Sequence, residues 1–180
     1  MKLGFTGTMS VGKTTLVNEL RKLEQFKDYK FFTERSKELK ELGIPLNKDS
    51  TIKGQTIFMA ERATELMNEN MITDRTIIDV IAFTIASSHI FSDVKASMIN
   101  IASYLVKEYD LIIYIPPTLA IEDNGIRETD SEYRKVIDVN IKSLLHDFGV
   151  DYYTLKSDEV ENRINEIVKV VNNVKNQQLG

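Results

Sequence analysis

Nine residues near the N-terminus have the types and the spacing of a phosphate-binding loop. Residues 7–15 read Gly-Thr-Met-Ser-Val-Gly-Lys-Thr-Thr. Glycine lets the backbone take positive φ angles and come close enough to a phosphate for its N–H groups to donate hydrogen bonds. The lysine would reach the β- and γ-phosphates, and the hydroxyl of the threonine after it would bind Mg²⁺. The segment predicts an ATP or GTP site formed by Gly7, Thr8, Met9, Ser10, Val11, Gly12, Lys13, Thr14 and Thr15.

The segments on either side of this loop support the same interpretation. An apolar strand is expected at Lys2–Gly7, and Lys13–Glu24 carries apolar residues at helical spacing. A strand before the loop and a helix after it is the context in which the motif binds phosphate, because the helix N-terminus adds N–H groups and a positive dipole end. A chance match is the alternative, and this context argues against it. The motif alone does not separate hydrolysis, transfer and switching.

The elements that must position this loop alternate between strand and helix along the chain. Short segments rich in β-branched or aromatic residues are separated by longer ones, which is typical of βαβ units around a parallel sheet. The predicted fold is α/β, a three-layer α/β/α P-loop NTPase fold in one domain, residues 1–180, with a five-stranded parallel sheet in the order 2-3-1-4-5. The predicted strands are Lys2–Gly7, Tyr29–Glu34, Met71–Asp74, Asp110–Ile115 and Asp151–Leu155.

Helices are predicted where apolar residues recur every three to four positions. Besides Lys13–Glu24, the pattern covers Thr51–Asn70. A third helix is expected to open with the capping box Thr129-Asp130-Ser131-Glu132, and the last one opens at Ser157-Asp158-Glu159, whose negative charge suits a helix N-terminus. The tail Asn172–Gly180 is polar enough to fray.

Composition narrows the class of protein. The 180 residues are 42% apolar and 28% charged, with a net charge of -4. The chain therefore lacks the excess of basic charge that would predict a polyanion as its partner. The absence of cysteine excludes disulfides, thiolate zinc sites and thiol nucleophiles. No apolar stretch reaches the roughly 20 residues of a membrane span. We therefore expect a cytoplasmic protein with no membrane partner.

Acidic residues followed by arginine come at the ends of the second and third predicted strands. These pairs are Glu34-Arg35 and Asp74-Arg75. A small GTPase would need a guanine-reading Asn-Lys-x-Asp motif, whereas the strand ending at Ile115 is followed by Pro-Pro-Thr-Leu. A motor or AAA-type ATPase would usually end a strand in adjacent acidic residues, and here the third strand ends in Thr-Asp-Arg-Thr. Both classes are therefore disfavoured.

On these residues the chain resembles P-loop kinases of nucleosides and nucleotides. Deoxyribonucleoside and thymidylate kinases carry an acidic residue and an arginine after their third strand, as in Asp74-Arg75, and an acidic residue after their second, as in Glu34. Deoxyribonucleoside kinases also carry a base-reading glutamine followed by an arginine, which Gln55 and Arg62 resemble. Small phage-encoded nucleotide kinases share this size and plan, and related kinases pair as homodimers.

A charged segment further along resembles the mobile lid of nicotinamide riboside kinase-like proteins. The lid candidate covers residues 122–134 and contains Arg127 and Arg134. In those proteins such a segment places arginine near the phosphates, so the resemblance implies the same for Arg127. An ordinary exposed loop is the alternative, because the segment is dense in charge.

Phosphoryl transfer chiefly requires two oxygens in line and neutralisation of the charge on the phosphate oxygens. The expected catalytic residues are Lys13, Glu34, Asp74, Arg75 and Arg127. Glu34 is the first candidate for the base that takes the acceptor's proton, and Asp74 is the second. Whichever of the two is not the base would serve Mg²⁺; Asp74, together with Thr14, is the choice for the metal. The expected substrate-binding residues are Glu34, Arg35, Gln55, Arg62 and Arg134.

Structural roles compete with several of these assignments. Glu34-Arg35 would also suit a solvated helix start, and Asp74-Arg75 a structural ion pair. Asp79 and Glu61 are expected to be capping or surface charges. Four phenylalanines could stack on a base, but core packing is the more usual role of such residues. These are Phe31, Phe32, Phe58 and Phe83. Phe58 is the least favoured of the four for stacking.

The leading interpretation is a kinase that uses ATP and Mg²⁺ to phosphorylate a nucleoside or a nucleoside monophosphate, with a deoxyribonucleotide precursor as the first candidate for the acceptor. One alternative is a P-loop kinase acting on a modified base in DNA, for which the scattered Lys37, Lys40, Lys48 and Lys53 offer only a hint. A second alternative is a regulatory NTPase whose bound phosphate orders a loop that partners recognise.

Overall fold

A parallel five-stranded sheet forms the centre of the computed structural model, which describes residues 1–33, 35–118 and 130–178. Its strand order is β2-β3-β1-β4-β5, as predicted. Each strand is one or more residues shorter than the sequence indicated. The strands are β1 Lys2–Thr6, β2 Lys30–Phe32, β3 Met71–Thr73, β4 Leu111–Tyr114 and β5 Tyr152–Thr154.

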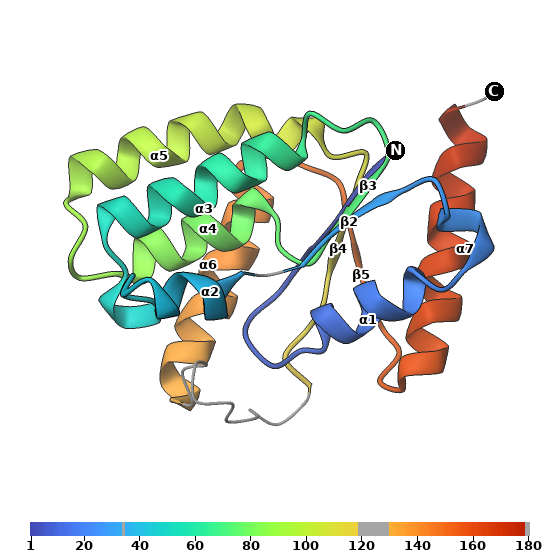
Figure 1. The fold of residues 1–180 in the computed structure, drawn as a ribbon, viewed down its shortest axis with the longest axis horizontal. Helices are drawn as coiled ribbons and strands as arrows, with labels where there is room; N and C mark the ends of the chain where they lie inside the picture. The colour runs from blue at the N-terminus through green and yellow to red at the C-terminus, as the bar shows by residue number, and fades with distance from the viewer. Residues whose placement is uncertain (34, 119–129, 179–180) are drawn as a thin grey trace.

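Helices cover both faces of the sheet and complete three layers, as predicted (Figure 1). In Figure 1 α1 and α7 lie on one side, and α3, α4, α5 and α6 lie on the other. None of the helices in the part of the chain that the structure describes is long and apolar enough to cross a membrane. The helices are α1 Lys13–Leu20, α2 Ser36–Glu41, α3 Ile52–Glu65, α4 Ile77–Ala86, α5 Ser92–Leu105, α6 Ser131–Asp147 and α7 Val160–Gln178, with short 3₁₀ turns at Glu24–Phe26, Asn47–Asp49 and Val106–Glu108.

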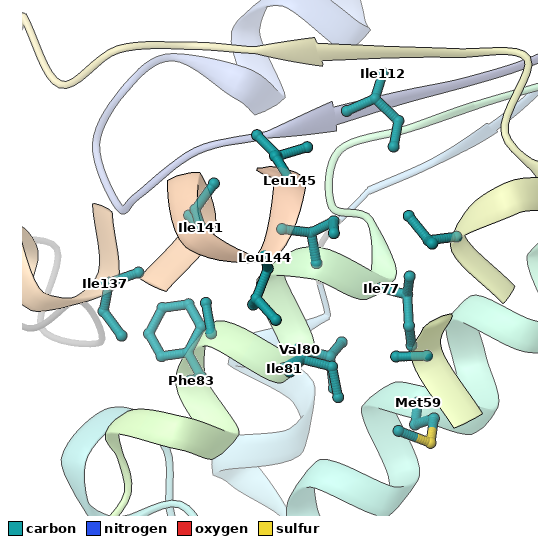
Figure 2. Packing of buried hydrophobic residues seen from close by; sticks show 14 of the residues in the cluster. Met59, Ile77, Val80, Ile81, Phe83, Ile112, Ile137, Ile141, Leu144 and Leu145 are labelled. Atoms are coloured by element: carbon teal, nitrogen blue, oxygen red, sulfur yellow. The ribbon is translucent and has the colours of Figure 1, made fainter. Parts of the chain in front are cut away.

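Two apolar clusters, one on each face, hold the layers together. The cluster under α3–α6 includes Ile81, Ile112 and Ile141, which come from α4, β4 and α6 (Figure 2). The cluster on the other face joins β1 and β4 to α1 and α7. All four residues of β4 are buried, which explains why its sequence has no polar alternation.

Three helices were not predicted from the sequence, and their composition explains why. Eight of the ten residues of α4 are buried, so apolar residues surround it and no amphipathic period remains to detect. In α5 only Met98 and Ala102 are buried. The short α2 offers one buried residue, Leu39.

Two helix ends also differ from the predictions. The N-cap of α6 is Asp130, whose side chain accepts hydrogen bonds from the backbone N–H groups of Glu132 and Tyr133. The predicted cap, Thr129, lies outside the described residues. At the other end of the chain, α7 continues to Gln178 through most of the tail that was expected to fray, and residues 179–180 lie outside the described residues. Packing of Val171 into the core extends the helix into this polar stretch.

Candidate active site

The predicted phosphate loop leaves β1 at the edge where the parallel strands end. Ser10 has a φ of 58° and Gly12 a φ of 89°, so the loop turns twice through left-handed backbone. Successive N–H groups in such a turn form a concave site for anions. A Cβ at Gly7 would lie 2.7 Å from the carbonyl oxygen of Ile115, so the loop also requires glycine for space.

Lys13 and the first turn of α1 face this loop. Lys13 is 5% exposed, and its ammonium donates to the carbonyl oxygens of Gly7 and Thr8, both at 2.7 Å. Gly12 is the N-cap of α1, so the helix begins with the N–H groups of its first turn directed at the loop. A small cavity of about 10 Å³ lies inside the loop and is lined by Met9–Thr14, Asp74 and Arg75.

Thr14 and Asp74 provide oxygen atoms that suit a magnesium ion. The Thr14 hydroxyl donates to the Asp74 carboxylate at 2.5 Å, and Asp74 is fully buried where β3 ends. Among the described residues no cluster of three or more acidic or histidine side chains could hold a metal by itself. Mg²⁺ commonly uses only one or two protein oxygens and completes its shell with water and substrate phosphates. The pair therefore fits a magnesium ion that is held jointly with a nucleotide.

Arg75 lies between the phosphate loop and a second cavity. Its guanidinium pairs with the Asp79 carboxylate at 3.6 Å and lies over the Phe83 ring, 5.3 Å from its centroid. Asp79 is fully buried and accepts hydrogen bonds from the backbone N–H groups of Gly7 at 3.3 Å and of Thr76 at 2.9 Å. The carboxylate therefore caps α4, as the sequence suggested, and also connects Arg75 to the loop.

The second cavity opens between α2, α3 and α4 and holds about 40 Å³, room for a few water molecules. Gln55 lines it and is 3% exposed, and its Oε1 has no hydrogen-bond partner among the described residues. Two of the phenylalanines considered for stacking, Phe58 and Phe83, line it as well. Phe58, the least favoured from the sequence, is therefore one of the two that reach this cavity.

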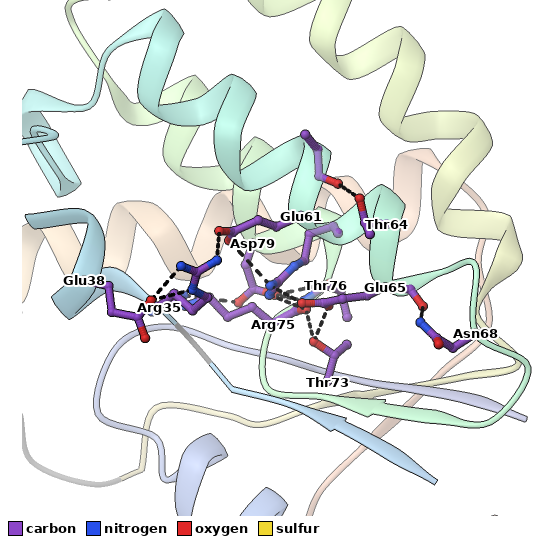
Figure 3. Close-up of polar contacts among 12 residues, drawn as sticks. Arg35, Glu38, Glu61, Thr64, Glu65, Asn68, Thr73, Arg75, Thr76 and Asp79 are labelled. Carbon is purple, nitrogen blue, oxygen red and sulfur yellow. Dashed lines mark hydrogen bonds and ion pairs between the residues drawn. The ribbon is translucent and has the colours of Figure 1, made fainter. Parts of the chain in front are cut away.

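Arg62 lines the cavity and belongs to a buried polar network. Figure 3 labels Glu65, Thr73 and Arg75 of this network. Its guanidinium pairs with Glu65 and donates to the carbonyl oxygen of Arg75 at 3.2 Å, whereas its Nε has no partner among the described residues. Glu65 also accepts from the Thr73 hydroxyl at 2.8 Å. Burial raises the pKa of Glu65 to about 7, although Arg62 and the Thr73 hydroxyl favour its charged form.

The remaining predicted site residues lie in different places. Arg35 is exposed and pairs with Glu38 at 2.6 Å and with Glu61 at 3.2 Å, which links α2 to α3 (Figure 3). Arg134 lies against the phosphate loop, because its Nε donates to the Thr8 hydroxyl at 3.2 Å, and it does not line the cavity of Gln55. Burial lowers its pKa from the usual arginine value.

Glu34, Arg127 and residues 119–129 lie outside the described residues. Of the lid candidate, residues 130–134 form the cap and first turn of α6. Thr15, the last residue of the predicted phosphate loop, is exposed on the first turn of α1.

Three buried charges near the site were not recognised from the sequence. Asp79 was considered only as a capping or surface charge. Glu65 follows Arg62 by three positions on one helix face, a spacing that could have indicated a pair. Arg163, on α7, donates to the carbonyl oxygen of Val11 at 2.8 Å across 152 positions of sequence, and no local pattern indicates that contact.

Known structures share this architecture along nearly the whole chain. Deoxyadenosine kinase from M. mycoides, solved with dCMP and dCDP, is 19% identical with a TM-score of 0.68, over 97% of this chain and all of that one. NadR in complex with NR is 18% identical with a TM-score of 0.75, over 96% of this chain and 50% of that one, so the chain spans about half of NadR. The fold is thus one that nucleoside kinases use.

A search of curated proteins finds no match. A family model described as an AAA domain matches residues 2–163. That description conflicts with the expectation, based on the sequence, that the chain is not an AAA-type ATPase. The expectation rested on the end of the third strand, where Asp74 is followed by Arg75 and not by a second acidic residue. The match covers most of the chain, which therefore belongs to this AAA-domain family of P-loop proteins.

Proposed function

We propose that the protein is an ATP- and Mg²⁺-dependent kinase that transfers the γ-phosphate to a hydroxyl of a nucleoside. The observation that carries the proposal is the position of Arg75, which lines both the cavity inside the phosphate loop and the cavity of Gln55. A cation between a phosphate site and an organic pocket can neutralise charge on a phosphoryl group as it passes from one to the other.

The donor side of the proposal rests on the phosphate loop. The N–H groups of residues 7–13 and the ammonium of Lys13 would hold the β- and γ-phosphates, and Lys13 would exchange a carbonyl partner for a phosphate oxygen. Thr14 and Asp74 would hold Mg²⁺, which supplies charge neutralisation at the phosphates. Arg134, which contacts Thr8, would add positive charge at the loop, and the resemblance to kinases with a lid implies the same for Arg127.

The charges around the second cavity favour an acceptor without a phosphate. Arg35 pairs with Glu38 and Glu61, and Arg62 pairs with Glu65, whereas Arg75 is already assigned to the transferred phosphoryl group. An acceptor monophosphate carries nearly two negative charges and would have to break such pairs to find a counter-charge. A neutral nucleoside would not, so this pairing supports a nucleoside over a nucleoside monophosphate.

The lining of the second cavity suits a flat base with polar edges. Phe58 and Phe83 offer aromatic surface, and the Oε1 of Gln55, which has no partner among the described residues, is an acceptor that a base N–H can satisfy. A nucleoside is far larger than 40 Å³, so we infer that Ser36 and Leu46, on the α2 side, move outward when it binds. Glu34 is the proposed base for the acceptor hydroxyl.

A panel of acceptors with ATP and Mg²⁺ tests this function. It should contain the common ribo- and deoxyribonucleosides, their monophosphates and duplex DNA with hydroxymethylated bases, with products identified by mass. The expected product is a nucleoside monophosphate that the Lys13→Ala variant does not form. Product from DNA alone would favour the alternative acceptor, and slow ATP hydrolysis without any product would favour a regulatory NTPase.

A further inference from the structure

The guanidinium of Arg163, on α7, connects three loops at the edge of the sheet that carries the phosphate loop. Its Nη1 donates to the carbonyl oxygen of Val11 at 2.8 Å, its Nε to that of Ser157 at 2.7 Å, and its Nη2 to the Thr118 hydroxyl at 3.4 Å. Asp158 lies 3.9 Å away. The loops after β1, β4 and β5 are therefore held by one side chain that is only 3% exposed.

The charge of Arg163 is not explained by the packing of α7. The next residues along the same helix face, Ile167 and Val171, are fully buried in the apolar cluster with α1. Position 163 lies four residues before Ile167 on the same helix face. An apolar side chain at this position would therefore be enough for the packing of α7. Burying a charge is costly unless its hydrogen bonds are used. Of the hydrogen bonds that Arg163 makes outside the loop before α7, the shortest is the one to the backbone of the phosphate loop.

The bond to Val11 determines the orientation of one N–H group of the phosphate loop. The carbonyl of Val11 and the N–H of Gly12 belong to the same planar trans peptide, so they point in opposite directions. Arg163 does not line the cavity inside the loop, and its Nη1 lies 3.4 Å from where a Cβ of Gly12 would be. With the carbonyl turned toward Arg163, the Gly12 N–H points away from Arg163, and Gly12 is one of the residues that line the cavity.

We propose that Arg163 is a positioning residue that holds the Val11–Gly12 peptide in the orientation that binds phosphate. Glycine at position 12 has the backbone freedom to let this peptide rotate, and the hydrogen bond from Arg163 opposes that rotation. The inference rests on the proposed function, because it requires that the loop binds the phosphates of a nucleotide.

Calorimetric titration of ATP and of inorganic tripolyphosphate, each with Mg²⁺, tests the inference. Arg163→Met removes the donors while keeping a long side chain, and Arg163→Lys keeps the charge and one donor group. Ile167→Val, on the same buried face of α7, is the matched control for a loss of packing alone. Arg163→Met should weaken both ligands by the same factor of about tenfold, which corresponds to about 1.4 kcal/mol. Arg163→Lys should recover part of that loss, and Ile167→Val should lower the melting temperature without changing either affinity.

Three results would overturn the inference. One is wild-type affinity for both ligands in Arg163→Met, the second is weaker ATP binding with unchanged tripolyphosphate binding in that variant, and the third is a loss in Ile167→Val as large as that in Arg163→Met. If Arg163→Met does not fold, wild-type affinities in Arg163→Lys count against it in the same way. Failure of the wild type to bind either ligand would instead contradict the proposed function.

Discussion

Replacing Gln55 by methionine should make the protein more stable and a poorer enzyme. The Oε1 of Gln55 is buried without a partner among the described residues, and an unsatisfied buried acceptor costs about 1–3 kcal/mol. Methionine has a similar length and no such cost, so the free energy of unfolding should rise by about 1 kcal/mol. The base should lose its hydrogen bond to Oε1, worth about 1 kcal/mol, so the KM for the nucleoside should rise roughly fivefold.

Urea denaturation measures the first effect, and steady-state kinetics with the nucleoside and ATP varied separately measures the second. The KM for ATP should not change, because Gln55 lines the second cavity and not the phosphate loop. Thr64→Val, on the exposed side of the same helix, is the control and should show neither effect. A Gln55→Met protein that is less stable than wild type, or that keeps the wild-type KM for the nucleoside, would refute the reasoning.

Three further variants test other parts of the site. Gly7→Ala should lower the free energy of unfolding by about 2 kcal/mol and weaken ATP binding, because its Cβ meets the Ile115 carbonyl. Gly43→Ala, at a position with positive φ but open space, is the control and should lose clearly less stability in urea titrations. Equal losses of stability in the two variants would refute the steric argument. The pKa of Glu65 is raised to about 7 from 4.5, so its protonated form stabilises the folded state fully below about pH 4.5, and that stability is lost as the pH rises to 7. Over this range the wild type should lose about 3 kcal/mol relative to Glu65→Gln in denaturant titrations, and parallel pH profiles would contradict the assignment. Glu34→Gln should reduce kcat by about 100-fold or more while calorimetry finds ATP affinity unchanged, and a wild-type kcat would remove Glu34 as the base.

The parts of the site that lie within one stretch of sequence were predictable. The phosphate loop is a local motif, because one strand, one turn and one helix hold all of its donors. Asp74 and Arg75 follow β3 directly, and parallel strands bring their carboxyl ends to one edge, so their place beside the loop follows from the order of strands. Gln55 was found by resemblance, and its burial at a cavity could not be read from its helix alone.

Contacts between distant segments were not predictable. The period of α7 identifies Ile167 and Val171 as an apolar face, yet it cannot indicate that Arg163 on that face meets the backbone of Val11. Asp79 reads as a capping residue of α4, since the same carboxylate fits the capping box, and its bond to Gly7 depends on how α4 packs under β1. In each case tertiary packing brings together groups that local patterns describe separately.

Binding of a bisubstrate analogue tests the central claim, that Arg75 connects a donor phosphate site to a nucleoside pocket. The analogue joins the γ-phosphate of ATP through added phosphates to the 5′ oxygen of the nucleoside that the acceptor panel identifies. If both sites are engaged at once, the linked ligand should bind about 100-fold more tightly than ATP, and Gln55→Met should reduce this gain. An analogue that binds wild-type protein no more tightly than ATP would show that the second cavity does not face the donor phosphate, which would contradict the account.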